Sequence, residues 1–244
     1  MSNTPPRYLR ALILRVAAAA LFWPGTASAQ VGHAPESSPY RDLRAKHILS
    51  FTGGYVAGNA GKAGVGPTNG RFGAVRYDLH LSGALAMGFG FSFGYVDRLL
   101  IDPAEGPDTR TLGNATQSVT MADLGINLVL TGAKTWRRLA PYVGFSLGLA
   151  FGGEIPEDSL SGFAFSTKFQ LSPQAGVHWY VTDRLSIRLE GRDILWRLSY
   201  PSRFFDSPAN DPTADPILDP QTTKTTQWTH NPTLLLSLGY TVRM

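Results

Sequence analysis

Cysteine is absent from the 244-residue sequence, which excludes a disulfide-stabilised scaffold and any site built on thiolate ligands. Charged residues are scarce, at 16% of the chain against about 25% in an ordinary globular domain. No uncharged apolar run reaches the roughly 18 residues of a membrane-spanning helix, so a multi-span helical protein is excluded. Glycine is abundant, with 26 residues. The composition favours small and uncharged side chains, and it names no ligand or reaction.

The first 29 residues have the pattern of a secretory signal peptide. Three arginines precede the apolar run 16–23, and the small-residue sequence Ala-Ser-Ala ends at Ala29. The apolar run is too short for a membrane anchor, so we predict cleavage before Gln30 and export. Loss of the three arginines lowers the formal net charge from +4 to +1. The basic character therefore belongs mostly to the signal peptide, and nucleic-acid binding loses its support.

Two different segments follow the signal peptide. Residues 30–46 are polar and show no hydrophobic period, so they are predicted to form a flexible periplasmic segment before the folded domain 47–244. In 89–95, large aromatic residues alternate with glycine and serine, and 143–151 and 234–244 repeat this period of two. Such a period is typical of β-strands and excludes helices.

Eight segments carry this pattern, and short and long connections alternate between them. The predicted strands are 47–57, 71–81, 85–97, 118–131, 139–152, 163–180, 185–197 and 232–244. The connections 82–84, 132–138 and 181–184 are short, whereas 58–70, 98–117, 153–162 and 198–231 are longer. This arrangement is typical of bacterial outer-membrane barrels. We therefore predict an all-β fold, an eight-stranded antiparallel up-and-down transmembrane β-barrel.

The two faces of each predicted strand serve different purposes. A strand can cross hydrocarbon only within a closed barrel, because every backbone polar group must be paired, and its outward face then needs apolar side chains. The interior of an eight-stranded barrel holds only packed side chains. The predicted lumen network consists of Arg76, Asp78, His80, Asp123, Asn127, Lys168, Gln170, Gln174, His178, Arg188, Glu190 and Arg192. Its four cations and three carboxylates nearly balance, so we interpret it as a structural polar plug.

Two segments resemble parts of known outer-membrane barrels. Residues 176–193, GVHWYVTDRLSIRLEGRD, are similar to a hairpin that recurs in small outer-membrane barrels, and 141–152, PYVGFSLGLAFG, are similar to another such strand. The segment 47–244 thus resembles the outer-membrane β-barrel family typified by the OmpA transmembrane domain and OmpX. The resemblance implies the fold, since family members have unrelated roles. No peptidoglycan-binding domain is expected after the eighth strand, and Met244 stands where the family's assembly signal usually ends in phenylalanine.

Two loop motifs suggest ligand binding but have simpler interpretations. The sequence GNAGKAGVG, 58–66, lacks two features of a phosphate-binding loop, because Val56 replaces its first glycine and Ala63 its Ser/Thr. We expect a mobile extracellular loop there. Three Asp-Pro pairs recur every four residues in 211–220, but proline prevents the helical turn that would align the acids around calcium. We expect a stiff, extended, solvated loop instead.

Two histidines are candidates for catalytic or metal-binding groups. His80, Ser82 and Asp78 could form a nucleophile arrangement such as a lipid A deacylase or acyltransferase needs. The trio falls at a predicted periplasmic turn, however, whereas lipid A acyl chains lie in the outer leaflet. His178 also faces the lumen, but it is expected on the wall opposite His80, and two distant histidines do not form a zinc site.

These patterns favour a structural or surface-interaction protein of the outer membrane, with no catalytic, cofactor-binding or metal site. Its expected partners are outer-membrane lipids, including lipopolysaccharide, and the barrel-assembly machinery, with a monomeric barrel and no nucleic acid. The alternatives are a lipid-modifying enzyme, a narrow solute pore and a soluble exported ligand-binding barrel. Long inward side chains argue against conduction. Outward aromatic residues in 89–93 argue against a soluble barrel, because they would leave an apolar belt in water.

Strand parity gives three further expectations. Aromatic girdles should flank the apolar band, with Tyr55, Tyr95 and Phe151 near the outer interface and Trp179 near the periplasmic one. Glu190 should lie inside the barrel among Arg76, Arg188 and Arg192. After Arg192 strict alternation would turn Trp196 inward, so a bulge at 191–193 is predicted to return it to the outer face. The alternative is that the strand has already left the bilayer by Asp193.

Overall fold

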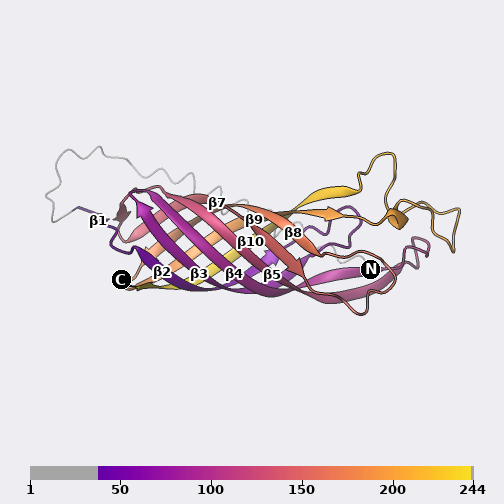
Figure 1. Ribbon diagram of the computed structural model, residues 1–244, viewed down its shortest axis with the longest axis horizontal. Helices are drawn as coiled ribbons and strands as arrows, with labels where there is room; N and C mark the ends of the chain where they lie inside the picture. Colours follow the sequence, from indigo (N-terminus) through magenta and orange to yellow (C-terminus); the bar gives the residue numbers. More distant parts are fainter. Residues whose placement is uncertain (1–37, 243–244) are drawn as a thin grey trace. The chain divides into compact units, whose positions relative to one another are not determined.

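Eight long strands form a closed antiparallel barrel. A computed structural model describes residues 38–242, so the predicted signal peptide and mature start lie outside the described residues. The barrel strands are β2 (His47–Ala57), β3 (Asn69–Ser82), β4 (Leu85–Ile101), β5 (Thr111–Val129), β7 (Leu139–Gly152), β8 (Thr167–Tyr180), β9 (Leu185–Ser199) and β10 (Thr226–Val242). Each pairs with the next in the chain, and β10 pairs with β2 to close the ring (Figure 1). The predicted fold is confirmed.

Helical structure is minimal in the described part of the chain. It contains one short 3-10 turn, η2 (Ser202–Phe204), in the connection between β9 and β10. Between residues 38 and 242, no helix is long and apolar enough to cross a membrane.

Several strand ends at the long loops differ from the predicted positions. β5 begins at Thr111 rather than at residue 118, and β10 begins at Thr226 rather than at residue 232. β8 begins later than predicted, at Thr167 rather than at residue 163. The residues by which β10 exceeds its predicted range are paired, since Thr226 pairs with Ser199 on β9. The strands therefore project as a paired wall toward the long loops, which gather at one end of the barrel (Figure 1).

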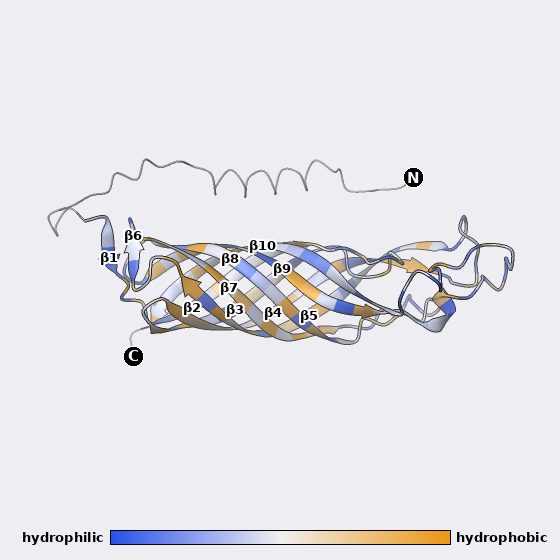
Figure 2. Ribbon diagram, turned by 90° about the horizontal axis from the view of Figure 1, so that it is seen from above, coloured by the Kyte–Doolittle hydropathy of each residue, from blue (hydrophilic) through white to orange (hydrophobic). Residues whose placement is uncertain are grey.

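An apolar belt surrounds the barrel. On β4 the outward Phe89, Phe91 and Phe93 are exposed, whereas Gly90 and Ser92 between them point inward. Cross-strand pairs carry the belt around the ring, since Phe91 pairs with Val75 on β3, and Val75 pairs with Phe51 on β2. Figure 2 shows apolar residues recurring along the barrel strands. The predicted girdle residues Tyr55, Tyr95, Phe151 and Trp179 are likewise exposed.

β9 shows no register shift, contrary to the predicted bulge at 191–193. Its pairing with β10 runs without a register shift from Leu185 to Ser199. Trp196 is fully buried, and its ring packs edge-on against Phe165 with 5.1 Å between centroids. The predicted outward position of Trp196 was therefore wrong.

The physical reason is a change of environment along β9. Asp193 lies on the outer face, where its carboxylate accepts a hydrogen bond from the backbone N–H of Asn231 at 2.8 Å and lies 2.6 Å from His230 Nδ1. His230 is 70% exposed, so this ionisable pair lies on the outer surface of the barrel. Beyond this level the inner face of β9 becomes apolar, with Ile194 and Trp196 buried. The strand keeps its alternation, but its inner face changes from polar to apolar beyond Arg192, and its outer face carries the charged Asp193 and Arg197.

A short two-stranded extension lies at the short-turn end of the barrel. β1 (Tyr40–Asp42) pairs with β6 (Lys134–Trp136), and β6 continues into β7 through a two-residue turn. The interpretation of 30–46 as a flexible segment is therefore wrong for the residues of β1, while residues 30–37 lie outside the described range. The sequence of β1 is too short and polar to show the period of a strand. Its extended conformation is stabilised by pairing with β6.

The barrel interior consists of three layers. Next to the short turns is a small apolar cluster formed by Ala45, Ile48, Val129, Ala140 and Tyr180. The middle layer is polar and charged. Toward the long loops lies a larger apolar cluster formed by Val56, Val65, Phe72, Val96, Ile101, Val119, Met121, Ala150, Phe163, Phe165, Ile194, Trp196, Leu198, Tyr200, Phe204 and Leu218, which we call the apolar cap. The candidate site is built from the polar layer and this cap.

Candidate functional site: the filled lumen

Ion pairs fill the middle layer of the barrel. Arg76 on β3 donates from Nε to one oxygen of Asp78 at 2.9 Å, and Arg188 on β9 donates to the other oxygen at 2.9 Å. Asp123 on β5 lies 4.0 Å from Arg76 and 3.6 Å from Arg192. All five side chains are at most 6% exposed. The pairs therefore join opposite walls of the barrel in a space that excludes bulk water.

Glu190 on β9 makes the most contacts in this layer. Arg192 donates to its Oε1 atom from Nε at 2.9 Å and from a terminal nitrogen at 2.5 Å, and the hydroxyl of Tyr142 donates to Oε2. Arg188 Nε lies 4.0 Å from Oε2. The side chain of Glu190 is 0% exposed. The structure thus places Glu190 inside the barrel beside these arginines, where strand parity puts it.

The buried cluster is electrically neutral. Its members are Arg76, Arg188, Arg192, Asp78, Asp123 and Glu190. The sequence interpretation counted a fourth cation, Lys168, but this residue is only half-buried and takes part in none of the ion pairs of the described residues. Equal numbers of opposite charges reduce the cost of burying ions, provided that each is paired.

Inward glycines make room for the charged side chains. A Cβ atom on Gly88 would lie 2.5 Å from Arg76 Nη2 and 2.5 Å from Asp78 Oδ1, and one on Gly90 would lie 3.0 Å from Asp123 Oδ2. The glycines of β4 are therefore required by close approach, because their missing side chains leave the space that the ion pairs fill. The alternation of large outward and absent inward side chains in the sequence reflects this division.

The predicted amides surround the ion pairs. Gln174 on β8 donates a hydrogen bond to Asn127 Oδ1 on β5 at 2.7 Å, and both residues are buried. Gln170, four residues closer to the cap on the same strand, is 1% exposed. These residues come together with the ion pairs in one polar layer.

The two predicted lumen histidines lie closer together than the sequence indicates. His80 and His178 come from β3 and β8, yet they line one cavity near the short-turn end, together with Asp78 and Tyr180. The expectation that they are distant was wrong because side chains from opposite walls meet in so narrow a barrel. The ring of His178 stacks on that of Tyr180 at 5.8 Å between centroids.

The side chains around this cavity form neither the nucleophile arrangement nor the metal site that the sequence suggests as alternatives. Among the described residues, no hydrogen bond joins His80 to Ser82 or to Asp78, and the Asp78 carboxylate is occupied by two arginines. Residues 38–242 also contain no group of three or more His, Asp or Glu side chains placed to hold a metal ion. The geometry thus supports neither a base for Ser82 nor a metal centre.

The apolar cap closes the lumen at the long-loop end. Trp196, Leu198 and Phe204 are fully buried within it. The ring of Tyr200 lies between those of Phe163 and Phe204, with centroids 6.2 Å away in each case. Rings contributed by three different chain segments therefore fill the barrel mouth.

Arg98 on β4 connects the long loops to one another within this cap. Its side chain donates to the carbonyl oxygen of Val65 at 2.9 Å and to that of Phe163 at 3.0 Å. It also forms an ion pair with Asp158, and both side chains are at most 4% exposed. One guanidinium group thus satisfies carbonyl groups from two loops and a carboxylate from one of them, which stabilises their packing.

Sequence reasoning missed this part of the site. Val96, Arg98 and Leu100 continue the inward parity of β4, so the alternation itself was available as a signal. The partners of Arg98 lie 33 to 65 residues away in irregular loops, where no period indicates contact. The parity could have found Arg98, but not Asp158.

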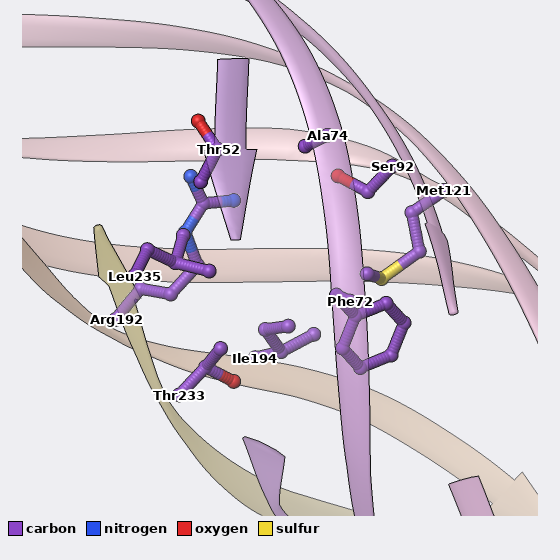
Figure 3. Close-up of a pocket in the computed structure, with 9 residues that line it drawn as sticks. All are labelled: Thr52, Phe72, Ala74, Ser92, Met121, Arg192, Ile194, Thr233 and Leu235. Carbon is purple, nitrogen blue, oxygen red and sulfur yellow. The ribbon is translucent and has the colours of Figure 1, made fainter. Parts of the chain in front are cut away.

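A small cavity separates the polar layer from the cap (Figure 3). It occupies about 10 Å³, roughly the space of one water molecule. Figure 3 shows the Arg192 guanidinium on one side near Thr52, with Phe72 and Met121 on the other side. The cavity marks the boundary between charged and apolar layers, and its size excludes an organic ligand.

The long loops are more ordered in their packing than the sequence suggests. The expected mobile loop 58–66 places Val65 fully buried in the cap, and Lys62 donates its backbone N–H to Gln227 Oε1 at 2.9 Å. The Asp-Pro segment 211–220 runs through turns rather than an extended chain. Its Asp219 accepts hydrogen bonds from Gln221 N–H and from the Thr222 hydroxyl, and these bonds hold the pKa of that carboxyl below its usual value. Its carboxylate thus stabilises a turn.

Comparison with known proteins concerns the fold. No protein-family model and no curated protein sequence matches the chain. Among solved structures, the outer-membrane protein OprG from Pseudomonas aeruginosa is 10% identical, with a TM-score of 0.50 over 85% of this chain and 100% of that chain. Neisserial surface protein A is 11% identical, with a TM-score of 0.48 over 80% of this chain and 97% of that chain. The N-terminal β-barrel domain of OprF from Pseudomonas aeruginosa is 11% identical, with a TM-score of 0.43, covering 79% and 96%.

At such identities only the fold is comparable, and the likeness to OprG carries that comparison. The closed antiparallel ring of strands agrees with it. The chain therefore has the fold of the eight-stranded outer-membrane β-barrels.

Proposed function

We propose that the chain is an exported outer-membrane barrel with a closed lumen, and that its role is structural or interactive at the long-loop surface. The observation that carries the proposal is the filling of the lumen by three successive layers inside a wall whose outer face is apolar. The barrel-assembly machinery and the lipids of the outer membrane, including lipopolysaccharide, are its proposed partners.

The outer face supports the membrane location. Leu147 and Leu149 on β7, Leu236 on β10 and Phe91 on β4 are each between 44% and 58% exposed, and they lie on different sides of the ring. A soluble protein rarely exposes a continuous apolar surface of this extent. In a bilayer the same residues contact hydrocarbon, and the closed strand ladder leaves no unpaired edge. A belt around the whole circumference also favours a monomer.

The filled lumen supports a role other than conduction. A conducting path would have to pass the apolar cluster at Ile48, the ion pairs of Glu190 and the cap around Trp196 in succession. The interior of an eight-stranded barrel is just wide enough for side chains to fill it, and the cavities left here hold about 10 Å³ each. The fixed packing of the loops over the cap leaves the long-loop surface as the part available to other molecules.

Cysteine labelling tests the membrane location and orientation, because the natural chain has no cysteine to interfere. Asp215→Cys lies in the exposed long loop, and Asp183→Cys lies in the exposed short turn between β8 and β9. A membrane-impermeant maleimide should label Asp215→Cys in intact cells and Asp183→Cys only after the outer membrane is opened. Equal labelling of both, or recovery of the protein in a soluble fraction, would contradict the proposal.

Planar-bilayer recordings test the closed lumen. The wild-type protein should give no steady channels, and gel migration that changes on boiling should show that the same preparation is folded. Persistent channels from folded wild-type protein would favour the solute pore instead.

A further inference from the structure

Basic side chains gather at the short-turn end of the barrel. Among the described residues, seven exposed cations at this end accompany two exposed carboxylates. The cations are Arg41, Arg44, Lys46, Lys134, Arg137, Arg138 and Arg184, and the carboxylates are Asp42 and Asp183. At the long-loop end the balance reverses, since carboxylates outnumber cations in 97–110, 153–158 and 206–219. The barrel is thus electrically polarised along its axis.

Aromatic rings border this basic surface on the lipid side. Tyr40 pairs with Trp136, Trp136 pairs with Leu139, and Leu139 pairs with Trp179. Directly paired residues share a face of the sheet, so the four side chains form one outward row. Tyr40, Trp136 and Trp179 are each between 43% and 50% exposed. Trp and Tyr favour the boundary between hydrocarbon and headgroups, so the basic residues beside this row lie at headgroup depth.

Two of the cations occupy a backbone conformation that arginine rarely adopts. Arg137 and Arg138 form the two-residue turn between β6 and β7, with φ values of 48° and 69°. A hairpin turn with two positive φ values normally contains Asn-Gly, because other residues crowd their own backbone there. The guanidinium of Arg137 lies over the Trp136 ring at 5.3 Å, and that of Arg138 donates to the carbonyl oxygen of Val181. Two exposed arginines therefore occupy turn positions where the backbone conformation favours asparagine and glycine.

We propose that this surface, formed by the turn Arg137-Arg138 with Arg184 and the flanking Trp136 and Trp179, binds the headgroups of anionic phospholipids in the inner leaflet of the outer membrane. The proposal rests on the proposed membrane location. Guanidinium groups bind phosphate oxygens through paired hydrogen bonds. The aromatic row is continuous with the apolar belt, which favours a lipid over a soluble acidic partner. The acyl chains of a lipid can contact the belt while its headgroup contacts the cations.

Fluorescence quenching by brominated lipids tests the proposal. In the exported protein with Trp228→Phe, Trp136 and Trp179 are the exposed tryptophans, since Trp196 is fully buried. The protein is inserted into phosphatidylcholine vesicles containing either brominated phosphatidylglycerol or brominated phosphatidylcholine, and the relative binding constant is obtained from quenching. One cation near an anionic surface contributes about fivefold to binding. We therefore expect phosphatidylglycerol to be preferred at least fivefold at low salt and the preference to fall in 1 M NaCl.

The decisive variant is Arg137→Asn/Arg138→Gly. It removes two cations while supplying the residues that the turn geometry favours, so the variant should fold and lose most of the preference. Arg71→Gln/Arg197→Gln removes two exposed arginines on the side of the long loops and should leave the preference unchanged. Arg137→Lys/Arg138→Lys keeps both charges but loses the paired hydrogen bonds of the guanidinium groups, so it should retain only part of the preference.

The outcomes separate this proposal from the one on which it rests. A protein that does not insert into either vesicle contradicts the membrane location itself. A protein that inserts but shows equal quenching by both lipids, or an Asn-Gly variant with undiminished preference, overturns the lipid-binding surface alone. A preference that does not respond to salt in the wild type also overturns it, and this measurement needs no variant.

Discussion

Removal of the Glu190 side chain is expected to destabilise the barrel more than any other single change in the polar layer. Glu190→Ala takes away the acceptor of two hydrogen bonds from Arg192 and leaves that guanidinium with Asp123 at 3.6 Å as its remaining ion partner. It also removes the acceptor of the Tyr142 hydroxyl. The buried cluster changes from neutral to one net positive charge. Breaking a buried pair from one side costs about 3 to 5 kcal/mol, so the free energy of unfolding should fall by about that amount.

A double variant provides the matched control. Glu190→Leu/Arg192→Met removes both charges and restores neutrality with side chains of similar size, so it should be less destabilised than Glu190→Ala by about 2 kcal/mol or more. Reversible urea unfolding in lipid vesicles, followed by tryptophan fluorescence, measures both values. If Glu190→Ala lowers the stability by less than about 1 kcal/mol, or if the double variant is as unstable as the single one, the charge-pairing argument is refuted.

Three further substitutions test the belt, the cap and the inward glycines by the same unfolding measurement. Phe91→Arg should cost about 2 to 4 kcal/mol because the proposed membrane location puts this exposed residue at mid-bilayer, whereas Phe91→Leu should be nearly neutral, and equal stability of the two would exclude that depth. Trp196→Ala should cost about 3 to 5 kcal/mol because the ring is 0% exposed; a loss below about 1 kcal/mol would argue against a packed cap. Gly88→Val should cost about 1 to 3 kcal/mol through overpacking, whereas Gly53→Val, with no atom within 4 Å of its Cβ position, should be tolerated, and the reverse order would contradict the assigned faces.

The sequence predicts most of the barrel wall because one physical rule governs it. Alternation with a period of two assigns each residue to a face, and β2 and β7 match the predicted ranges 47–57 and 139–152. The same rule does not say where the polar layer of the lumen ends and the apolar cap begins. Arg192 and Ile194 share the inner face of β9, and only their depth explains why one is charged and the other apolar. The prediction for Trp196 failed at this point.

Contacts between loops follow no local rule. Val65, Asp158 and Phe163 meet around Arg98 through closures of 33 to 65 residues, and their sequences show only the glycine, proline and serine typical of connections. The ladder between β1 and β6 likewise joins residues 94 positions apart, as shown by the hydrogen bond from Thr135 to Arg41. These contacts depend on where the ends of the strands place the connecting loops. They therefore follow from the closed barrel and not from the local sequence.

The ion pairs of the lumen also constrain how the barrel can assemble. Asp78 on β3 and Arg188 on β9 are 110 residues apart, and each is buried against the other. A hairpin of β3 and β4 that entered hydrocarbon alone would carry Arg76 and Asp78 without the opposite wall, and the later strands would carry Arg188 and Arg192 without Asp78 or Asp123. Unpaired charges in hydrocarbon are costly, so stepwise insertion of separate hairpins is disfavoured. The charges should cross the bilayer together, inside a sheet that has already begun to curl.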